Sequence, residues 1–502
     1  MRRFASLVSV LWLLSPFALA GVSLPVLLSD GVVLQRERPI HIWGKAAPGE
    51  TVQVAFLKQS KSTTADFAGR WHIYLSPEAA GGPYELTVAG ANKIVLHDVL
   101  VGDVWVASGQ SNMEYPMEGW GGTAPTQAQE IPKANLPSVH LLHVEHAYSD
   151  HPLNDLGSAV KWESCTPETV RQFSAVAYYF AKEITAHEKV PIGVIETSWG
   201  GTPAEAWTSL DGLSSNANLM PVFAARAEMS DSQIASALNE VHEDQLKAEA
   251  KAKGLPEPQF DWHPDPHSWA PTELYNAMLA PLTLLPIRGV IWYQGESNSG
   301  EARAQNYEEL FETMIRDWRA HWGIGNFPFL FVQISAFSPG PGERWAFIRE
   351  AQRKTLSLAN TGMAVTIDIG NRDDVHPTDK LDVGLRLSLA ARALTYGERI
   401  EFSGPAFRQI TREQHGLRIW FDHAHTLKPA AKGWCGFEVA GEDGKYAPAE
   451  TKMDGSTIVV SNATIDTPQS VRYAWENYPE CPFFNEANLP ASPFRASLPL
   501  FH

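Results

Sequence analysis

The middle of the chain alternates short apolar runs with stretches of helical periodicity. Runs such as Val104-Trp105-Val106-Ala107 and Val290-Ile291-Trp292-Tyr293 have the length of strands and lack a polar face. Strands buried on both faces are typical of parallel sheets, whose crossover connections are helices. One such helix is expected from Asp379 onward, with Leu385 and Leu389 on its apolar face. The pattern predicts an α/β domain with a parallel sheet and helices on both faces.

Turn-rich β segments flank this α/β region. From Leu24 to about Val95, and again after Gly397, short strand-like runs alternate with Gly, Pro and Asp turns, a pattern that favours β-sandwiches or related β domains. A chain of 502 residues exceeds the size of one core, so several domains are expected. The predicted organisation starts with a leader at residues 1–20 and a sandwich at residues 21–98. An α/β domain follows at residues 99–210 and 273–397, interrupted by a polar insertion at residues 211–272. A C-terminal β-rich domain covers residues 398–502.

The first twenty residues have the composition of a signal peptide. Arg2 and Arg3 precede an apolar stretch from Ala5 to Leu14, and Ala18-Leu19-Ala20 forms a small-x-small cleavage site. No later segment is long and apolar enough to span a bilayer. We therefore expect a periplasmic or secreted protein.

Charge and cysteine content exclude several classes of protein. A net charge of −17 repels phosphate backbones, so nucleic acid is not an expected partner. Cys165, Cys435 and Cys481 are too few for a disulfide scaffold and lack metal-ligand spacing. Cys435 and Cys481 can pair in an oxidising compartment, which would leave Cys165 as a buried thiol; the sequence leaves this pairing open.

Two residues suited to nucleophilic catalysis each follow a predicted strand. Ser111 lies in Gly109-Gln110-Ser111-Asn112-Met113, after the strand that ends at Ala107, and His376 follows the strand Ala364-Val365-Thr366-Ile367. A serine hydroxyl needs a histidine base to become a nucleophile. Carboxyl ends of parallel strands share one edge of the sheet, so we expect Ser111 and His376 to meet there.

These motifs resemble those of the SGNH hydrolases, and more closely the bacterial sialate O-acetylesterase-like carbohydrate esterases. The resemblance also rests on motifs spread along the chain: Ser198-Trp199-Gly200-Gly201-Thr202-Pro203, Leu274-Tyr275-Asn276, Trp292-Tyr293-Gln294-Gly295-Glu296-Ser297-Asn298, His376-Pro377 and Val471-Arg472-Tyr473-Ala474-Trp475. It implies a flavodoxin-like SGNH fold and a serine esterase that removes acetyl groups from sugars, without metal or cofactor. The expected substrate is an acetylated oligosaccharide or polysaccharide; sialic acid, xylan and xyloglucan remain alternatives, and the oligomeric state is undetermined.

The resemblance also assigns roles to individual residues. Ser111 is the nucleophile, His376 the base, and an aspartate before the histidine orients its ring. The superfamily pattern favours Asp373, three residues before His376, whereas Asp374 is the alternative.

Donors for the carbonyl oxygen are expected from the backbone and from one side-chain amide. The N–H groups of Ser111 and of a glycine in Gly200-Gly201, taken as Gly201, would supply the backbone donors. Gln294 is the expected third donor, and Asn298 is the alternative because this chain departs from the superfamily's Gly-x-Asn-Asp block.

Other residues support rival interpretations. Glu296 at the end of a strand, with Glu114 or Glu205 as a second acid, would suit a glycosidase, although this leaves Ser111 and His376 unexplained; Glu296 is expected to brace its loop. A sugar-binding module without catalysis is a second rival. The segment Asp261-Trp262-His263-Pro264-Asp265-Pro266-His267 matches no zinc spacing, and Trp120 and Trp262 are candidates for stacking on sugar rings.

Overall fold

The computed structural model describes residues 21–224, 242–243, 245–258, 265 and 267–499. The leader, Trp262 and most of the acid- and histidine-rich segment around it lie outside this part of the chain. Within the described residues, no helix is long and apolar enough to cross a membrane.

The N-terminal region is a β-sandwich that merges into the α/β domain through one strand. Its strands are β1 (Val33–Gln35), β2 (Ile40–Lys45), β3 (Thr51–Phe56), β4 (Gln59–Thr64), β5 (Arg70–Leu75), β6 (Gly81–Ala89) and β7 (Lys93–Gly109). β2 pairs with β5, and the other sheet contains β4, β3, β6, β7 and β1. The first half of β7 pairs with β6, and its second half pairs with strands of the central sheet. The boundary expected at residue 98 therefore falls inside a continuous strand.

A mostly parallel sheet forms the centre of the molecule, as the sequence predicts. Its strand order is β13-β12-β11-β7-β10-β8-β9, where only the β8–β9 pair at the edge is antiparallel. The strands not yet bounded are β8 (Leu136–His143), β9 (Trp162–Cys165), β10 (Ile192–Ser198), β11 (Gly289–Tyr293), β12 (Phe329–Gln333) and β13 (Thr361–Val365). When the edge strands β8 and β9 are left out, the remaining strands can be numbered 1 to 5 in chain order: β7, β10, β11, β12 and β13. They then lie side by side in the order 2-1-3-4-5. The direction of the connections thus reverses next to β7.

Helices cover both faces of this sheet. α3 packs against α9, and α7 packs against α8; since the connections reverse at β7, right-handed crossovers place the two pairs on opposite faces. The helices are α1 (Ser111–Glu114), α2 (Pro125–Glu130), α3 (Ala175–Glu188), α4 (Leu210–Ser214), α6 (Glu301–Ala304), α7 (Tyr307–Trp322), α8 (Trp345–Thr355) and α9 (Lys380–Leu394). Single turns are η1 (Ile131–Lys133), η2 (Ala204–Trp207), η3 (Ala217–Leu219), η4 (Tyr275–Leu279), η5 (Ala280–Leu282) and η6 (Glu296–Asn298).

The C-terminal region is a second sandwich with its own core. One sheet has the order β14-β15-β20-β19 and the other β18-β17-β21-β23, with β16 and β22 as a separate pair. The strands are β14 (Ala406–Glu413), β15 (Gly416–Asp422), β16 (Leu427–Lys428), β17 (Phe437–Ala440), β18 (Ala447–Pro448), β19 (Glu450–Asp454), β20 (Thr457–Ser461), β21 (Ser470–Tyr473), β22 (Phe484–Asn485) and β23 (Phe494–Ser497). A disulfide joins Cys435 to Cys481, and Cys165 is a buried free thiol.

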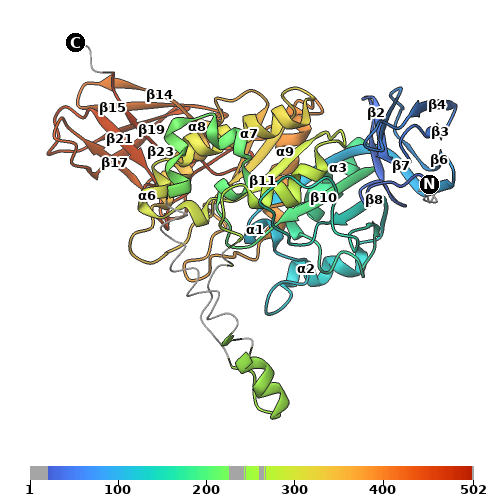
Figure 1. Ribbon diagram of the computed structural model, residues 1–502. Coiled ribbons are helices and arrows are strands. Elements are labelled where there is room, and N and C mark those ends of the chain that lie inside the picture. The colour runs from blue at the N-terminus through green and yellow to red at the C-terminus, as the bar shows by residue number, and fades with distance from the viewer. Residues whose placement is uncertain (1–20, 225–241, 244, 259–264, 266, 500–502) are drawn as a thin grey trace, which may run out of the picture.

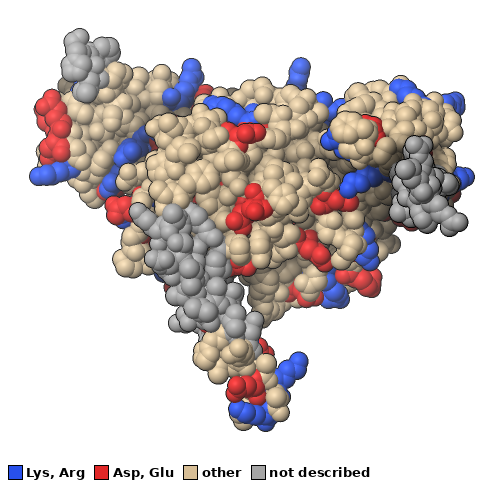
Figure 2. Space-filling model, in the orientation of Figure 1, with Lys and Arg blue, Asp and Glu red and all other residues tan. Residues whose placement is uncertain are grey.

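The two sandwiches lie on opposite sides of the α/β domain (Figure 1). Buried apolar side chains of the N-terminal sandwich and of the α/β domain form one continuous cluster, whereas the C-terminal sandwich has a separate cluster. On the face shown in Figure 2, Lys and Arg side chains are scattered among acidic and neutral residues.

Candidate active site

Ser111 begins a short helix at the carboxyl end of β7, the strand at which the connections reverse. Gly109 leaves the strand with φ +141°, and a Cβ there would approach Tyr293 O to 2.1 Å, so only glycine lets the chain turn this close to β11. Gln110 N donates to Tyr293 O at 3.0 Å and fixes the turn on the neighbouring strand. The Ser111 side chain therefore emerges at the edge of the sheet where ligands bind in folds of this type.

His376 reaches Ser111 from the loop between β13 and α9. Its Nε2 lies 2.8 Å from Ser111 Oγ, although 265 positions separate the two residues in the sequence. Burial is the largest cause that lowers the pKa of His376 below its ordinary value, and the charge of Lys380 acts in the same direction. A neutral imidazole is the form that can accept the serine proton. The structure thus brings together the nucleophile and base expected from the sequence.

The acid beside the histidine is Asp374, and the expectation of Asp373 is not met. Asp374 Oδ1 accepts the His376 backbone N–H at 2.8 Å, and the same oxygen lies 3.7 Å from His376 Nδ1. This is an Asx turn, in which a carboxylate bonds the N–H two residues further on and is thereby held beside that residue. Asp373 is exposed and makes no hydrogen bond or ion pair with His376. The turn geometry, rather than the spacing of three residues, decides which acid approaches the ring.

The backbone N–H groups of Ser111 and Gly201 have no acceptor within the described residues, and the same is true of Asn112, which follows the serine. A Cβ on Gly200 would lie 3.3 Å from Ser111 Cβ, so this glycine loop passes directly beside the serine. The Gly200 N–H instead donates to Glu114 Oε2 at 2.6 Å. Of the glycine pair, Gly201 therefore has the free donor that the sequence assigns to it.

The Gly201 loop is held from outside by Trp269, at the end of the predicted insertion. Trp269 Nε1 donates to Gly201 O at 2.6 Å, and the Arg303 guanidinium lies 4.3 Å from the Trp269 ring centre. The sequence assigns no role to this tryptophan. The indole thereby holds the peptide group between Gly201 and Thr202, which follows the Gly201 N–H in the chain.

The side-chain amides proposed as a third donor point into the protein interior. Gln294 Nε2 donates to Asn298 Oδ1 at 2.7 Å and to Thr202 O at 3.2 Å, which uses both of its N–H groups. Asn298 Nδ2 donates to Glu205 Oε2 at 2.9 Å. Both amides are almost fully buried. The expectation that Gln294 is the third donor is therefore not met, because both of its N–H groups already bond buried acceptors. Asn298 uses one of its two N–H groups on Glu205.

The acids considered for a glycosidase are also engaged. Glu296 Oε1 accepts from Asn112 Nδ2 at 2.7 Å, and Glu296 Oε2 is buried without a donor among the described residues; burial raises the pKa of this carboxyl. Glu205 accepts a hydrogen bond from Asn298, Glu114 accepts one from the Gly200 N–H, and Glu114 Oε1 lies 3.1 Å from His146 Nε2. Glu296 links its own loop to the Ser111 turn through Asn112.

Aromatic side chains surround the serine and histidine. The Trp120 ring stands edge-on to His376 with centroids 5.1 Å apart, and 45% of Trp120 is exposed. The His146 ring stacks on Trp199 with centroids 4.3 Å apart, and its Nε2 lies 3.1 Å from Glu114 Oε1. Of the two tryptophans suggested for sugar stacking, Trp120 is therefore at the site, whereas Trp262 lies outside the described residues.

Sequence reasoning missed Asn112 and Lys380, which lie directly behind the serine. Lys380 Nζ donates to Asn112 Oδ1 at 2.5 Å, and Lys380 is fully buried. A signal was present in the sequence: Lys380 follows the expected helix start at Asp379, where the helix dipole disfavours a positive charge. No group of three or more His, Cys, Asp or Glu among the described residues could hold a metal ion.

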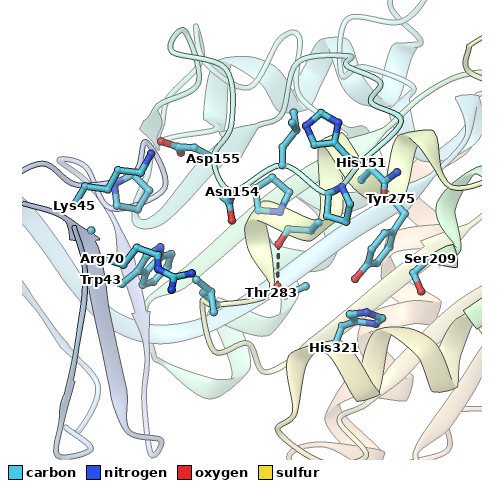
Figure 3. Close-up of a pocket in the computed structure, with 18 of the residues that line it drawn as sticks. Trp43, Lys45, Arg70, His151, Asn154, Asp155, Ser209, Tyr275, Thr283 and His321 are labelled. Atoms are coloured by element: carbon cyan, nitrogen blue, oxygen red, sulfur yellow. Dashed lines mark hydrogen bonds between the residues drawn. The ribbon is translucent and has the colours of Figure 1, made fainter. Parts of the chain in front are cut away.

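A separate cleft of about 980 Å³ lies between the N-terminal sandwich and the α/β domain. Trp43, Lys45 and Arg70 line one side, and Tyr275 and His321 line the other (Figure 3). Ser209 also lines it, but its Oγ donates to Asp317 Oδ1 at 2.6 Å, and His321 Nδ1 lies 3.1 Å from the same oxygen. The Ser209 hydroxyl faces the Asp317 carboxylate rather than a histidine ring, so the cleft differs from the arrangement found at Ser111.

Comparison with known proteins agrees with this geometry. The family model described as "carbohydrate esterase, sialic acid-specific acetylesterase" matches residues 101–239 and 260–395. The sialate O-acetylesterase of Homo sapiens is 30% identical over 519 residues, covering 93% of this chain and 91% of that protein. The corresponding Mus musculus enzyme is 29% identical over 523 residues, covering 94% and 93%.

A solved structure is similar over nearly the whole chain. It is a carbohydrate acetylesterase from Xanthomonas citri, with a TM-score of 0.81 and 37% identity, and the match covers 95% of this chain and 99% of that one. The family match includes both the Ser111 turn and the His376 loop. The chain therefore belongs to the sialic acid-specific acetylesterase family of carbohydrate esterases, and is a carboxylic ester hydrolase.

Proposed function

We propose that this protein removes O-acetyl groups from carbohydrates through an acyl-enzyme formed on Ser111. The observation that carries the proposal is the 2.8 Å approach of His376 Nε2 to Ser111 Oγ, at the sheet edge of a chain that belongs to an acetylesterase family. The family supplies the reaction class, and the geometry supplies the pair of groups that would perform it.

The chemistry follows from the pair. Ser111 Oγ attacks the acetyl carbonyl carbon while His376 Nε2 takes the hydroxyl proton. The bond from this carbon to the sugar oxygen then breaks, and His376 returns the proton to that oxygen, which leaves acetyl-Ser111. Water attacks the acyl-enzyme, its proton passes to His376, and acetate leaves as Ser111 recovers its proton. Such a sequence gives ping-pong kinetics.

Asp374 and two backbone groups complete the proposed machinery. Asp374 orients the His376 ring and stabilises the imidazolium that forms during the reaction. The N–H groups of Ser111 and Gly201 donate to the negative oxygen of the tetrahedral intermediate, because neither has another acceptor among the described residues.

The finer description of the fold is a flavodoxin-like SGNH hydrolase domain. The strand order 2-1-3-4-5 supports it, since flavodoxin-like sheets have this order and bind ligands next to the first and third strands. The β8–β9 pair extends the sheet beyond its second strand.

The proposed substrates are acetylated sialic acid or acetylated plant cell-wall glycans such as xyloglucan or xylan, so the enzyme would take part in polysaccharide or glycan breakdown. The proposed location is the periplasm or the extracellular medium. The Cys435–Cys481 disulfide supports export, because disulfides persist in oxidising compartments.

The test is acetate release from acetylated glycans and from p-nitrophenyl acetate by the wild type, Ser111→Ala and Ser209→Ala. Ser111→Ala is expected to lower kcat by about 10⁴-fold or more, because the nucleophile is lost. Ser209→Ala is the matched control, since that serine has no histidine base. Undiminished acetate release by Ser111→Ala would refute the proposal, and glycosidic cleavage that depends on Glu296 would favour the rival glycosidase.

A further inference from the structure

A buried lysine and a buried carboxylate lie behind the nucleophile, and the proposed reaction uses neither. Lys380 is the first residue of α9 and is fully buried, and Glu296 Oε2 is buried with no donor in the part of the chain that the structure describes. Burying an ionisable group costs several kcal/mol unless its hydrogen bonds are satisfied. This cost indicates that the buried Lys380 and Glu296 side chains have a role at the site.

Asn112 connects these two groups to the loop that carries the base. Its Oδ1 accepts from Lys380 Nζ at 2.5 Å, and its Nδ2 donates to Glu296 Oε1 at 2.7 Å and to Val375 O at 3.0 Å. An ammonium group only donates, so Lys380 forces the oxygen of the Asn112 amide to face it. Both N–H groups then point to Glu296 and Val375, and the amide has one possible orientation.

This orientation ties the nucleophile turn to the histidine loop. Asn112 follows Ser111 in the chain, and Val375 precedes His376. A hydrogen bond between these neighbours spans 263 positions of sequence and fixes the backbone on either side of the Ser111–His376 pair. Displacing reacting groups by about 1 Å can cost about a hundredfold in rate.

We propose that Lys380 and Asn112 are positioning residues: the buried Lys380 ammonium orients Asn112, which holds the His376 loop against the Ser111 turn. The inference rests on the proposed Ser111–His376 mechanism. Lys380 and Asn112 would act through the Ser111–His376 pair.

Several charged groups around Lys380 bear on its protonation. Its ammonium faces the rings of Tyr115 and Tyr293, at 4.7 and 5.7 Å from their centres. Burial lowers the pKa of Lys380 to about 7, against the raising effect of three carboxylates, those of Glu296, Asp374 and Asp379. Lys380 therefore carries its charge at pH values below about 7.

The sign of the effect on His376 follows from the groups that face it. Burial and the Lys380 charge lower the pKa of His376, whereas Asp374 and Glu114 raise it. Removing the Lys380 charge leaves the raising contributions in place, so the pKa of His376 rises. The base then becomes neutral only at higher pH, and the acid limb of the rate profile moves to higher pH.

The experiment measures kcat and KM for p-nitrophenyl acetate between about pH 4 and 9. Lys380→Met is expected to shift the acid limb of kcat/KM upward by about one pH unit and to lower kcat by about tenfold.

Asn112→Asp keeps an acceptor for Lys380 but loses both N–H donors, and is expected to lower kcat by about 10- to 100-fold at nearly unchanged KM. Lys354→Met is the control, because Lys354 is half exposed and pairs with Glu308 on the surface; its profile should match the wild type.

The outcomes separate this inference from the proposed mechanism. Ser111→Ala is measured alongside: if it is inactive while folded Lys380→Met and Asn112→Asp keep wild-type kcat and an unmoved acid limb, the positioning role is overturned and the mechanism stands. If Ser111→Ala keeps its activity, the mechanism itself fails. Circular dichroism checks folding, and if Lys380→Met does not fold, the kcat of Asn112→Asp decides, with a wild-type value overturning the inference.

Discussion

At the scale of single residues, the site depends on which polar group each side chain meets. Ser111 and His376 face one another, while the neighbouring acids Asp373 and Asp374 differ in environment: Asp374 is held beside the imidazole by its bond to the His376 N–H, and Asp373 is exposed without such a contact. We therefore propose the orienting role for Asp374 rather than for Asp373.

Substituting the two acids separately tests this assignment. Asp374→Asn removes the negative charge beside the imidazolium but keeps an oxygen for the Asx turn, so kcat for acetyl ester hydrolysis is expected to fall by about tenfold or more. Asp374 is half exposed, which keeps this effect below that of a buried triad acid. Asp373→Asn is the matched control and is expected to retain wild-type kcat. A larger loss in Asp373→Asn than in Asp374→Asn would reverse the assignment.

At the scale of elements, β7 and α9 position the site. β7 carries the sandwich at one end and Ser111 at the other, and α9 begins at Lys380 with Asp379 as its N-cap. The helix start agrees with the sequence, but its most buried apolar residues are Val383, Leu387, Ala390 and Ala391, while Leu385 and Leu389 are only half buried. The helix packs against both α3 and the sheet, so contacts on two sides, rather than one apolar stripe, decide which residues are covered.

The C-terminal sandwich offers a test of a single covalent link. Replacing both Cys435 and Cys481 by Ser removes the disulfide, whose two cysteines are 46 positions apart in the sequence. The free energy of unfolding is expected to fall by about 2–4 kcal/mol. Calorimetry with and without reductant measures the effect. Reductant should lower the unfolding temperature of the wild type and of Cys165→Ala, whose thiol is unpaired, but not that of the double variant. Equal unfolding temperatures for the wild type and the double variant would contradict the prediction.

At the scale of the whole molecule, the N-terminal sandwich and the α/β domain behave as one unit. They share β7 and a continuous apolar core. A buried ion-pair cluster reinforces the junction: Asp103 on β7 accepts from Arg36, which follows β1, and from Arg288, which precedes β11. Burial tends to raise the pKa of Asp103, but the hydrogen bond from Arg36 and the charge of Arg288 hold it below its ordinary value.

Breaking this cluster is expected to destabilise the joined unit. Asp103→Asn leaves Arg36 and Arg288 without their buried counter-charge, so the free energy of unfolding at pH 7 should fall by about 3–5 kcal/mol. Because the pKa of Asp103 is depressed on folding, its stabilisation is present above the ordinary aspartate pKa and is lost as pH falls through the folded value. Urea denaturation at pH 7 and pH 3 measures both effects. Asp66→Asn, which breaks an exposed pair with Arg70, is the control and should change little; a similarly small change in Asp103→Asn would argue against the cluster's role.

The sequence by itself determined the parallel sheet, its flanking β domains and the meeting of Ser111 with His376. These follow from local patterns, because apolar runs form buried strands and the carboxyl ends of parallel strands share one edge. The match of motifs such as Gly109 to Met113 and Trp292 to Asn298 likewise identified the family.

The tertiary structure alone decided which polar groups are partners. Asp374 rather than Asp373 approaches His376, Gln294 and Asn298 turn inward, and Lys380 lies buried behind Ser111 against Asn112. The shared strand β7 is also a tertiary result, since nothing local marks where one domain's pairing ends. The physical reason is that a hydrogen bond depends on distance and direction between groups far apart in the chain, which periodicity and spacing do not encode.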